Sequence, residues 1–245
     1  MRRLPLSPVR FLFSAIVLGV AASPQMALAG PPYVTDDPVP TETRHWEVFS
    51  FTENDFDHGE TSGTAGFDIN YGLVEDVQLT ATLGLDYRSG SSPKFGDTEV
   101  GFKYRFFHDE AHGRQLAIFP KVIFPTAPGP GRAAFQIPVW AQQDFGHWSL
   151  FGGGGITIRR DPGSRNSWNE GIAVANQVRD GLVLGAEVAH SGAEEVDSHG
   201  VTTLDAAINV HLSGPFSLVG AVGPQIEDST GHTSIRGYLG ILSNF

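Results

Sequence analysis

The sequence predicts an all-β protein, a membrane-spanning antiparallel up-and-down β-barrel of about 12 strands. Apolar and polar residues alternate in one short segment after another. Tight and long connections alternate between these segments. Charged residues stand in the middle of segments whose other face is continuously apolar. No window contains an amphipathic helix longer than a turn or two. A barrel with short periplasmic turns and longer outer loops accounts for all these features.

The first 29 residues have the composition of a secretory signal peptide. Three arginines precede an apolar core from Phe11 to Ala22, and a small-residue cleavage pattern follows at Ala27-Leu28-Ala29. The core is too short to cross a bilayer as a helix, which needs about 18 apolar residues. The expected division of the chain is a signal peptide over residues 1–29, a Pro-rich segment over residues 30–43 and a barrel over residues 44–245.

The charge of the chain limits its partners. Without residues 1–29, 13 Lys and Arg face 27 Asp and Glu, so the formal net charge is about −14. Such an acidic surface disfavours nucleic acid and anionic lipid headgroups. The chain contains no cysteine, so an exported form has no disulfide and depends on its own hydrogen bonds and packing.

The clearest strand is predicted at residues 77–87, "VQLTATLGLDY". Its odd positions from Val77 to Tyr87 are all apolar or aromatic, and its even positions carry Gln, Thr, Gly and Asp. Residues 64–72, 97–107 and 201–212 repeat the alternation. Strands of this length with one apolar face match the thickness of a bilayer.

The connections between the predicted strands fall into two groups. Tight ones lie at residues 73–76, 108–113, 144–147, 179–181 and 213–216. Longer polar ones lie at residues 54–63, 88–96, 125–134, 159–167, 191–200 and 225–231. Because the two groups alternate along the chain, we expect all tight turns at one barrel end and all longer loops at the other.

Charged residues on the polar faces favour a barrel with a wet interior over a soluble sandwich, which buries one face of every strand in a shared core. In lipid every backbone polar group must be paired, and a closed sheet achieves this without a free edge. The candidate lumen-facing residues are Asp68, Asp86, Glu99, Lys103, Arg105, Lys121, Glu187, Asp205 and Arg236. Charges of both signs at close quarters set the selectivity of a pore, but they can equally pair and shut it.

Aromatic residues indicate which ends of the strands meet the membrane surfaces. Trp46, Tyr71, Tyr104, Phe106 and Trp148 lie near the tight turns, and Tyr87 and Trp168 lie near the longer loops. At the C-terminus, Ile235, Leu239 and Ile241 alternate toward a final aromatic residue, Phe245, although Ser243 interrupts the pattern. The end resembles the C-terminal signal by which bacterial outer-membrane barrels are recognised for assembly.

Several blocks together resemble a family of proteobacterial outer-membrane proteins, transporter-like and related to the meta-pathway of phenol degradation. The blocks are "GPPYVTDDPVPTETRHWEV", "INYGLVEDVQL", "YRSGSSPKFGDTEVGFKYRF", "FPKVIFPT" and "LFGGGGI". They extend over most of residues 30–245, and each alone is only a strand-and-turn pattern. The resemblance implies a barrel that passes small molecules across the outer membrane. It carries no catalytic motif onto this sequence.

Two histidine motifs have other interpretations. His108 and His112 flank Glu110 in "HDEAH", but zinc would need both imidazoles on one helical face, and we expect a solvated turn there. His232 and Ser234 share a strand face, an arrangement similar to that of outer-membrane phospholipases. Asn244 lies about 33 Å away along the strand, so it cannot orient the histidine. The remaining histidines that we considered lack ligand spacing: His45, His58, His190, His199 and His211.

Three further segments have structural interpretations. Four glycines at residues 152–155 lack the Lys and Ser or Thr of a phosphate-binding loop and favour a close approach of strands within the wall. Glu194, Glu195 and Asp197 form an acidic loop, which we expect to be solvated rather than to hold a cation that bridges lipopolysaccharide. The Pro-rich segment is compatible with a plug in the lumen or with a periplasmic tail.

The sequence therefore predicts passage or binding of a small hydrophobic or aromatic solute by an outer-membrane barrel in a Gram-negative bacterium. The alternatives are a non-conducting barrel that binds surface partners and, less favoured, a lipid hydrolase. We expect no catalytic residue, metal or cofactor. The expected partners are outer-membrane lipid and lipopolysaccharide, the barrel-assembly machinery and a small-molecule solute, with no nucleic acid.

Overall fold

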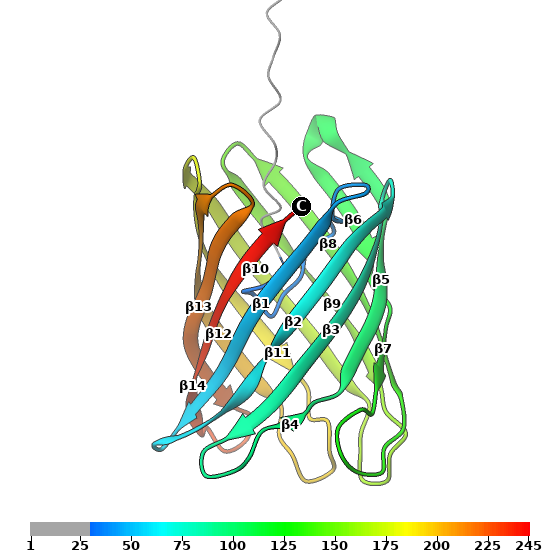
Figure 1. The fold of residues 1–245 in the computed structure, drawn as a ribbon, viewed down its shortest axis with the longest axis vertical. Coiled ribbons are helices and arrows are strands. Elements are labelled where there is room, and N and C mark those ends of the chain that lie inside the picture. Colours follow the sequence, from blue (N-terminus) through cyan, green and yellow to red (C-terminus); the bar gives the residue numbers. More distant parts are fainter. Residues whose placement is uncertain (1–29) are drawn as a thin grey trace, which may run out of the picture.

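The computed structural model describes residues 30–245, which form a closed antiparallel β-barrel (Figure 1). The expected signal peptide lies outside the described residues. The one helical element, η1, is three residues long, and no helix among residues 30–245 has the length and hydropathy needed to cross a bilayer. The elements are β1 (Trp46–Asp57), β2 (Glu60–Val74), β3 (Val77–Arg88), β4 (Lys94–Phe95), β5 (Thr98–Asp109), η1 (Glu110–His112), β6 (Arg114–Ile118), β7 (Lys121–Phe124), β8 (Ala134–Phe145), β9 (Trp148–Ile158), β10 (Ser167–Arg179), β11 (Leu182–Ser191), β12 (Val201–Ser213), β13 (Phe216–Glu227) and β14 (Thr233–Asn244).

The wall has 12 strand positions because two of them are interrupted. The short β4 and the longer β5 both pair with β3, and β6 and β7 both lie between β5 and β8. Phe119 and Pro120 separate β6 from β7, because Pro120 has no backbone N–H with which to continue the strand pairing. Pairing of β1 with β14, from Glu47 opposite Asn244 to Phe56 opposite Ile235, closes the barrel. This architecture confirms the predicted fold class.

The tight turns lie at the end of the barrel where the chain terminates (Figure 1). The longer stretches at residues 125–133, 159–166 and 192–200 lie at the opposite end. The expected loop at residues 54–63 differs, because β1 and β2 extend through most of it and leave only His58 and Gly59 as a turn. Both have positive φ, 48° and 88°, as a two-residue hairpin turn requires.

The two faces of each strand differ as the alternation predicts. On β3, Leu79, Leu83 and Leu85 point outward and are 42–45% exposed, whereas Gln78 and Thr80 point inward and are buried. Such a large exposed apolar surface fits hydrocarbon rather than water. Further outward side chains in the belt are Phe67, Val100, Phe102, Ile137, Val139, Ile172, Leu184, Val188, Leu204, Ile208, Val222, Ile235 and Leu239.

The C-terminal residue completes the barrel seam. The backbone N–H of Phe245 donates to the Trp46 carbonyl at 2.9 Å, and the Trp46 N–H donates back to Phe245 at 3.0 Å. Trp46 also lies against Tyr71, with ring centroids 4.6 Å apart. Tyr238 and Leu242, the two apolar residues of β14 on the inward face, are buried in the lumen. The end of the chain is therefore part of the wall at the tight-turn rim.

Candidate functional site

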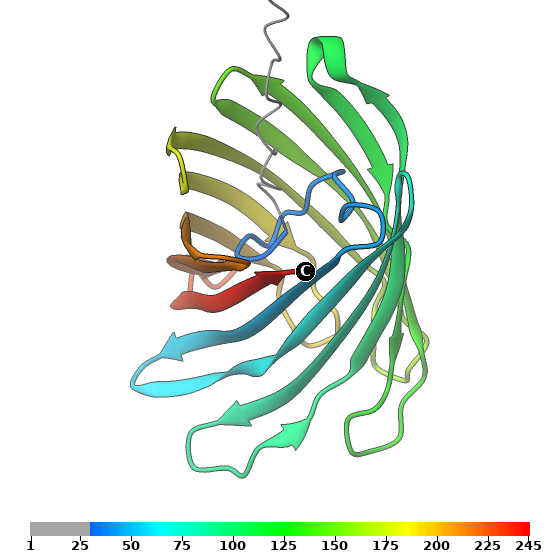
Figure 2. The same ribbon diagram turned by 45° about the horizontal axis from the view of Figure 1, so that its top comes forward.

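Residues 30–43 turn back into the barrel and lie inside its lumen toward the tight-turn end (Figure 2). We call them the inner segment. Thr35 and Asp37 are each only 1% exposed, and Tyr33 is 9% exposed. Thr43 pairs with Gly72 near the tight-turn end of β2, which fixes where the segment meets the wall. The Pro-rich segment is thus a plug-like element and not a periplasmic tail.

Glu187 on β11 holds the middle of the inner segment. Its two carboxylate oxygens accept hydrogen bonds from the backbone N–H groups of Val34 and Thr35, at 2.8 and 2.9 Å. Thr35 is buried, so its N–H would otherwise lack a partner inside the lumen, which is costly. A charged acceptor also makes the stronger kind of hydrogen bond. Glu187 therefore anchors backbone rather than standing free in a pore.

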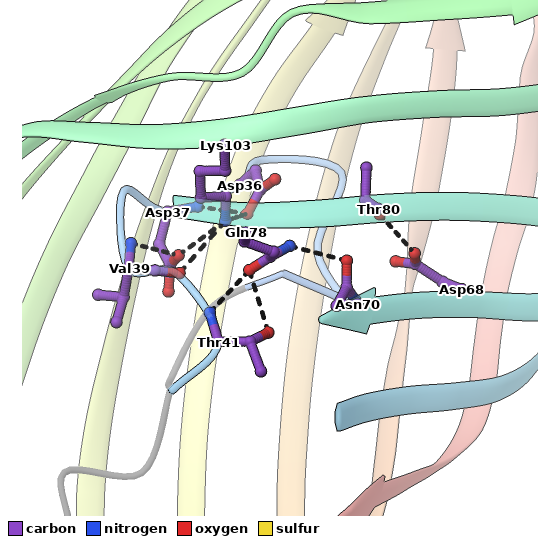
Figure 3. Close-up of polar contacts among 9 residues, drawn as sticks. All are labelled: Asp36, Asp37, Val39, Thr41, Asp68, Asn70, Gln78, Thr80 and Lys103. Carbon is purple, nitrogen blue, oxygen red and sulfur yellow. Dashed lines mark hydrogen bonds and ion pairs between the residues drawn. The ribbon is translucent and has the colours of Figure 1, made fainter. Parts of the chain in front are cut away.

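Lys103 on β5 binds the next part of the segment (Figure 3). Its ammonium donates to Asp36 Oδ1 at 2.9 Å, to Asp37 Oδ1 at 3.2 Å and to the Val39 carbonyl at 3.4 Å. Lys103 is 3% exposed, so the contacts are desolvated. Burial raises the pKa of the Asp37 carboxyl to about 6, while the charge of Lys103 opposes that rise.

A polar network continues along β2 and β3 beside the inner segment (Figure 3). Gln78 Oε1 accepts from the Thr41 backbone N–H at 2.8 Å, and its amide donates to Asn70 Oδ1 at 2.7 Å. Asp68 accepts from the Thr80 hydroxyl at 3.2 Å. Gln78 and Asn70 were not singled out from the sequence, although their inward parity marks both as lumen residues.

Arg236 on β14 links the inner segment to the wall on its other side. Its guanidinium donates to Glu53 Oε1 at 2.7 Å and also to the Asp205 carboxylate. Two further N–H groups reach the Pro32 carbonyl, at 3.3 and 3.2 Å. Arg236 is 3% exposed. A buried charge of this kind is tolerated because several acceptors surround it.

The other lumen candidates contact wall residues. Lys121 lies 3.4 Å from Glu99. Arg105 Nη2 lies 2.6 Å from Asp76, and Nη1 donates to Gln115. The remaining candidate, Asp86, accepts from the Thr64 hydroxyl at 2.7 Å near the loop end. Of the nine lumen candidates, the structure thus brings Lys103, Glu187 and Arg236 onto the inner segment, Asp205 beside Arg236, and the other five elsewhere in the wall.

Two glycines in the wall make room for the inner segment. A Cβ added to Gly185 on β11 would lie 1.9 Å from the Tyr33 hydroxyl. One added to Gly171 on β10 would lie 2.1 Å from Thr35 Oγ1. Distances this short are incompatible with any side chain unless the segment moves. Glycine therefore permits the close approach at both positions.

An apolar cluster fills the lumen beside these glycines. The Tyr33 ring meets Phe151 edge to face, with centroids 5.3 Å apart, and the Phe51 ring stacks on Tyr238 at 5.6 Å. Phe49 is also buried there, at 2% exposure. The rest of the cluster is Ala173, Ala175, Val183, Ala207, Val219, Ala221 and Leu242. The lumen thus has an apolar sector on β9–β14 and β1, facing the polar sector on β2–β7.

The loop end of the lumen contains a cavity of about 650 Å³, which we call the vestibule. It is lined by six carboxylates, two histidines, and no Lys or Arg among the described residues that line it. The carboxylates are those of Glu53, Asp55, Asp57, Glu194, Glu195 and Glu227. A smaller cavity of about 180 Å³ lies between the inner segment and the polar sector. The vestibule presents negative charge to whatever enters from the loop end.

The histidine motifs have the following surroundings. His112 lies in η1, 2.8 Å from Asp109, whereas His108 belongs to the end of β5, so the connection is shorter than the expected turn at residues 108–113. His232 faces Asp57 at 3.1 Å, and within residues 30–245 no hydrogen bond joins it to Ser234. Asp57 thus occupies the orienting position that Asn244 cannot reach. The nucleophile contact that a hydrolase needs is not formed in the described part of the chain.

The two remaining motifs are the four glycines and the acidic loop. The four glycines lie within β9, and a Cβ at Gly155 would lie 2.2 Å from the Ile137 carbonyl of β8, in line with the expected close approach. In the acidic loop, Glu194 pairs with Arg159 at 2.6 Å. Neither segment supplies an additional site in the described residues.

Comparison with known proteins supports the fold. A scan against protein-family models and a search of curated proteins found no match. Among solved structures, an outer membrane channel from Pseudomonas putida F1 is similar with a TM-score of 0.66 and 14% identity, covering 89% of this chain and 100% of that one. The NanC porin gives 0.61 and 7%, covering 81% and 98%. CymD, a monoaromatic hydrocarbon channel, gives 0.52 and 7%, covering 83% and 89%. At these identities the likeness establishes an outer-membrane-type barrel fold, one that channels and porins use.

Proposed function

We propose that this protein is an outer-membrane channel for a small solute, and that the inner segment controls passage through it. The observation that carries the proposal is the inner segment itself. It is held inside a closed barrel by side chains of the wall, chiefly Lys103, Glu187 and Arg236. A barrel whose own chain places an element in the lumen, held there by hydrogen bonds and ion pairs, is suited to regulated passage. The fold shared with channels supports the same function.

The lining of the lumen favours a solute with an apolar or aromatic body and no negative charge. Phe49, Phe51, Phe151 and Tyr238 form a continuous apolar wall that the inner segment now covers with Tyr33. Movement of the segment would offer this surface to a solute of similar character. The acidic vestibule in front of it repels anions and attracts cations.

Single-channel recording in planar bilayers, together with solute uptake into proteoliposomes, tests the proposal. We expect small or infrequent openings for the natural chain. The double variant Glu187→Gln and Lys103→Ala should conduct more, because the inner segment loses two of its anchors. Neutral and cationic aromatic solutes should enter faster than aromatic acids. A folded protein that neither conducts nor takes up any solute, with or without these substitutions, would remove the channel hypothesis.

A second candidate is a non-conducting barrel that presents its loops to surface partners. The observation that favours it is the number of lumen charges already paired with one another, such as Arg236 with Asp205 and Lys121 with Glu99. The same recordings separate the two, because permanent closure predicts silence even after the anchors of the inner segment are removed.

We further propose that Phe245 acts as the assembly signal and that the protein resides in the outer membrane of a Gram-negative bacterium after signal-peptide removal. Phe245 lies at the tight-turn rim and is 61% exposed, so an assembly machine can reach it. Deletion of Phe245 should lower the yield of inserted protein in cells but not refolding in detergent. Equal yields of inserted protein would argue against this role. Lipid and lipopolysaccharide would contact the outward belt.

A further inference from the structure

Three potential metal ligands meet at the loop end of the barrel although they are far apart in the sequence. Asp57 is the last residue of β1, His58 follows it in the β1–β2 turn, and His232 immediately precedes β14. One ligand atom from each residue lies within 4.8 Å of the other two. Sequence spacing gave no sign of this group, because the closing of the barrel alone brings β14 beside β1.

The carboxylate of Asp57 lies between the two imidazoles. His58 Nδ1 is 2.6 Å from Asp57 Oδ1, and His232 Nε2 is 3.1 Å from Asp57 Oδ2. The imidazole rings are nearly parallel, at 17°, with centroids 5.3 Å apart. Ligand atoms about 2.0 Å from a tetrahedral ion are about 3.3 Å from one another. Small rotations of the side chains would therefore suffice to surround an ion.

The backbone holds these residues in place. His58 has a φ of 48°, set by the two-residue turn with Gly59. The His232 backbone N–H donates to Thr230 Oγ1 at 3.0 Å, and its carbonyl accepts from the Glu227 N–H at 2.8 Å. The two turns therefore set the backbone positions of the three ligands before any ion arrives. Preorganisation of this kind favours binding.

The electrostatic surroundings also favour a cation. Asp57 and His232 line the vestibule, and the nearby carboxylates of Asp55 and Glu227 line the same cavity. A cavity lined by negative charge raises the local concentration of cations. Two imidazoles and one carboxylate suit zinc and similar divalent ions, whereas magnesium and calcium prefer sites built from oxygen alone.

We propose that Asp57, His58 and His232 form a binding site for a divalent transition-metal ion such as Zn²⁺, with water completing the coordination. The paired registers of β1 and β14 end at Phe56 and Ile235, so the ion joins the two strands just beyond their last backbone pair. It clips the seam of the barrel at the outer mouth. The contacts that support this site do not depend on the proposed solute passage.

Calorimetric titration of the folded, full-length mature protein with ZnCl₂ tests the proposal. We expect one ion per chain. His58→Phe keeps a ring stacked on His232 but removes a ligand. It should weaken zinc binding at least tenfold, because even the loss of a residue that only hydrogen-bonds to a metal ligand costs about tenfold or more. His232→Phe should do the same. His199→Phe is the matched control, since His199 lines the vestibule outside the group.

Two further readouts distinguish a built site from loose attraction to the acidic mouth. Co²⁺ should give the intense visible bands of tetrahedral coordination in the natural chain and lose them in His58→Phe. Zinc should slow the unfolding of the natural chain, and a chelator should restore the original rate. The unfolding rate of His232→Phe should not change when zinc is added. Unchanged zinc affinity in both histidine variants, or only the weak spectrum of octahedral Co²⁺, would overturn the proposal.

Discussion

The two halves of the lumen share the same strands but have different contents. In the tight-turn half, the inner segment packs on an apolar sector, its Asp36 and Asp37 carboxylates contact Lys103, and its Pro32 carbonyl accepts from Arg236. In the loop-end half, a cavity of about 650 Å³ is lined by carboxylates and histidines. The wall strands alternate equally well in both halves. The difference therefore arises from the inner segment together with the inward residues of the wall, which are apolar around the segment and include carboxylates at the loop end.

This contrast shows how one barrel can combine a filled and an open region. Buried charges are stable where they are paired and hydrogen-bonded, as they are around the inner segment. At the loop end, Glu53 and Glu194 also pair with arginines, but their side chains remain 44% and 51% exposed, so water solvates these carboxylates as well. In the proposed channel, a solute that enters the vestibule meets the acidic mouth first and the anchored inner segment second.

The largest effect is expected when the tight-turn half loses its buried cation. Lys103→Ala would leave Asp36 and Asp37 in the lumen without their ammonium partner. Breaking a buried pair costs about 3–5 kcal/mol, which corresponds to a hundredfold or more in the population of the undocked segment at about 1.4 kcal/mol per tenfold.

The chain has no cysteine, so Thr35→Cys provides a single thiol whose labelling rate reports undocking. Thr35 is 1% exposed in the docked state. Lys94→Ala, at an exposed lysine of the loop end, should leave the rate unchanged. Equal labelling rates with and without Lys103 would show that the ion pairs do not hold the segment.

The next largest effect is a loss of barrel stability, and it concerns the lipid-facing surface of the wall, which both halves of the lumen share. Leu83→Arg places a charge in the lipid-facing belt and should cost about 2–4 kcal/mol of unfolding free energy if it lies at the bilayer midplane. Thr82→Arg, one residue earlier, points into the lumen beside Asp68 and should cost far less. Urea unfolding in lipid vesicles measures both. Similar losses would contradict the assigned faces of β3.

A smaller effect is expected from filling the space under the inner segment. Gly185→Ala sets a Cβ against the Tyr33 hydroxyl and the Val174 carbonyl, and overpacking of this kind costs about 1–3 kcal/mol. Gly220→Ala is the matched control, because its nearest neighbour would be 3.4 Å away. Faster labelling of Thr35→Cys in the first variant alone is the expected result. No increase would mean that Tyr33 does not require this contact.

The smallest effect is a pH dependence of docking. Burial raises the pKa of Asp37 to about 6 in the docked segment, above the value of about 3.9 for a solvated Asp. Asp37 therefore keeps its proton to a higher pH when the segment is docked than when it is undocked. Docking is strongest below about pH 4, weakens as the pH rises toward 6 and is constant above that pH. Openings in planar bilayers should be rarer at pH 5 than at pH 7. Asp37→Asn should remove the difference, and a persistent one would assign the effect to another group.

The sequence was sufficient to predict the wall. Residues 77–87 alternate without exception, and each inward or outward position follows from that period because consecutive side chains of a strand point to opposite faces. Parity also marks Glu53, Asn70 and Gln78 as lumen residues, although we did not select them. The wrong expectation was a loop at residues 54–63, where His58 and Gly59 alone make the turn.

The sequence could not place the inner segment. Residues 30–43 lack a period, and their contacts are with Gln78, Lys103, Glu187 and Arg236, all far along the chain. The same reason hides the group of Asp57, His58 and His232, which exists only because β14 pairs with β1.

By itself, the sequence determined an outward apolar belt, an inward polar face and the number of strands, since these depend on local alternation and turn spacing. Only the tertiary structure decided which charges meet, what occupies the lumen and which histidines approach one another. Those features depend on closure of the sheet, which brings together residues from opposite ends of the chain, and no local pattern records that juxtaposition.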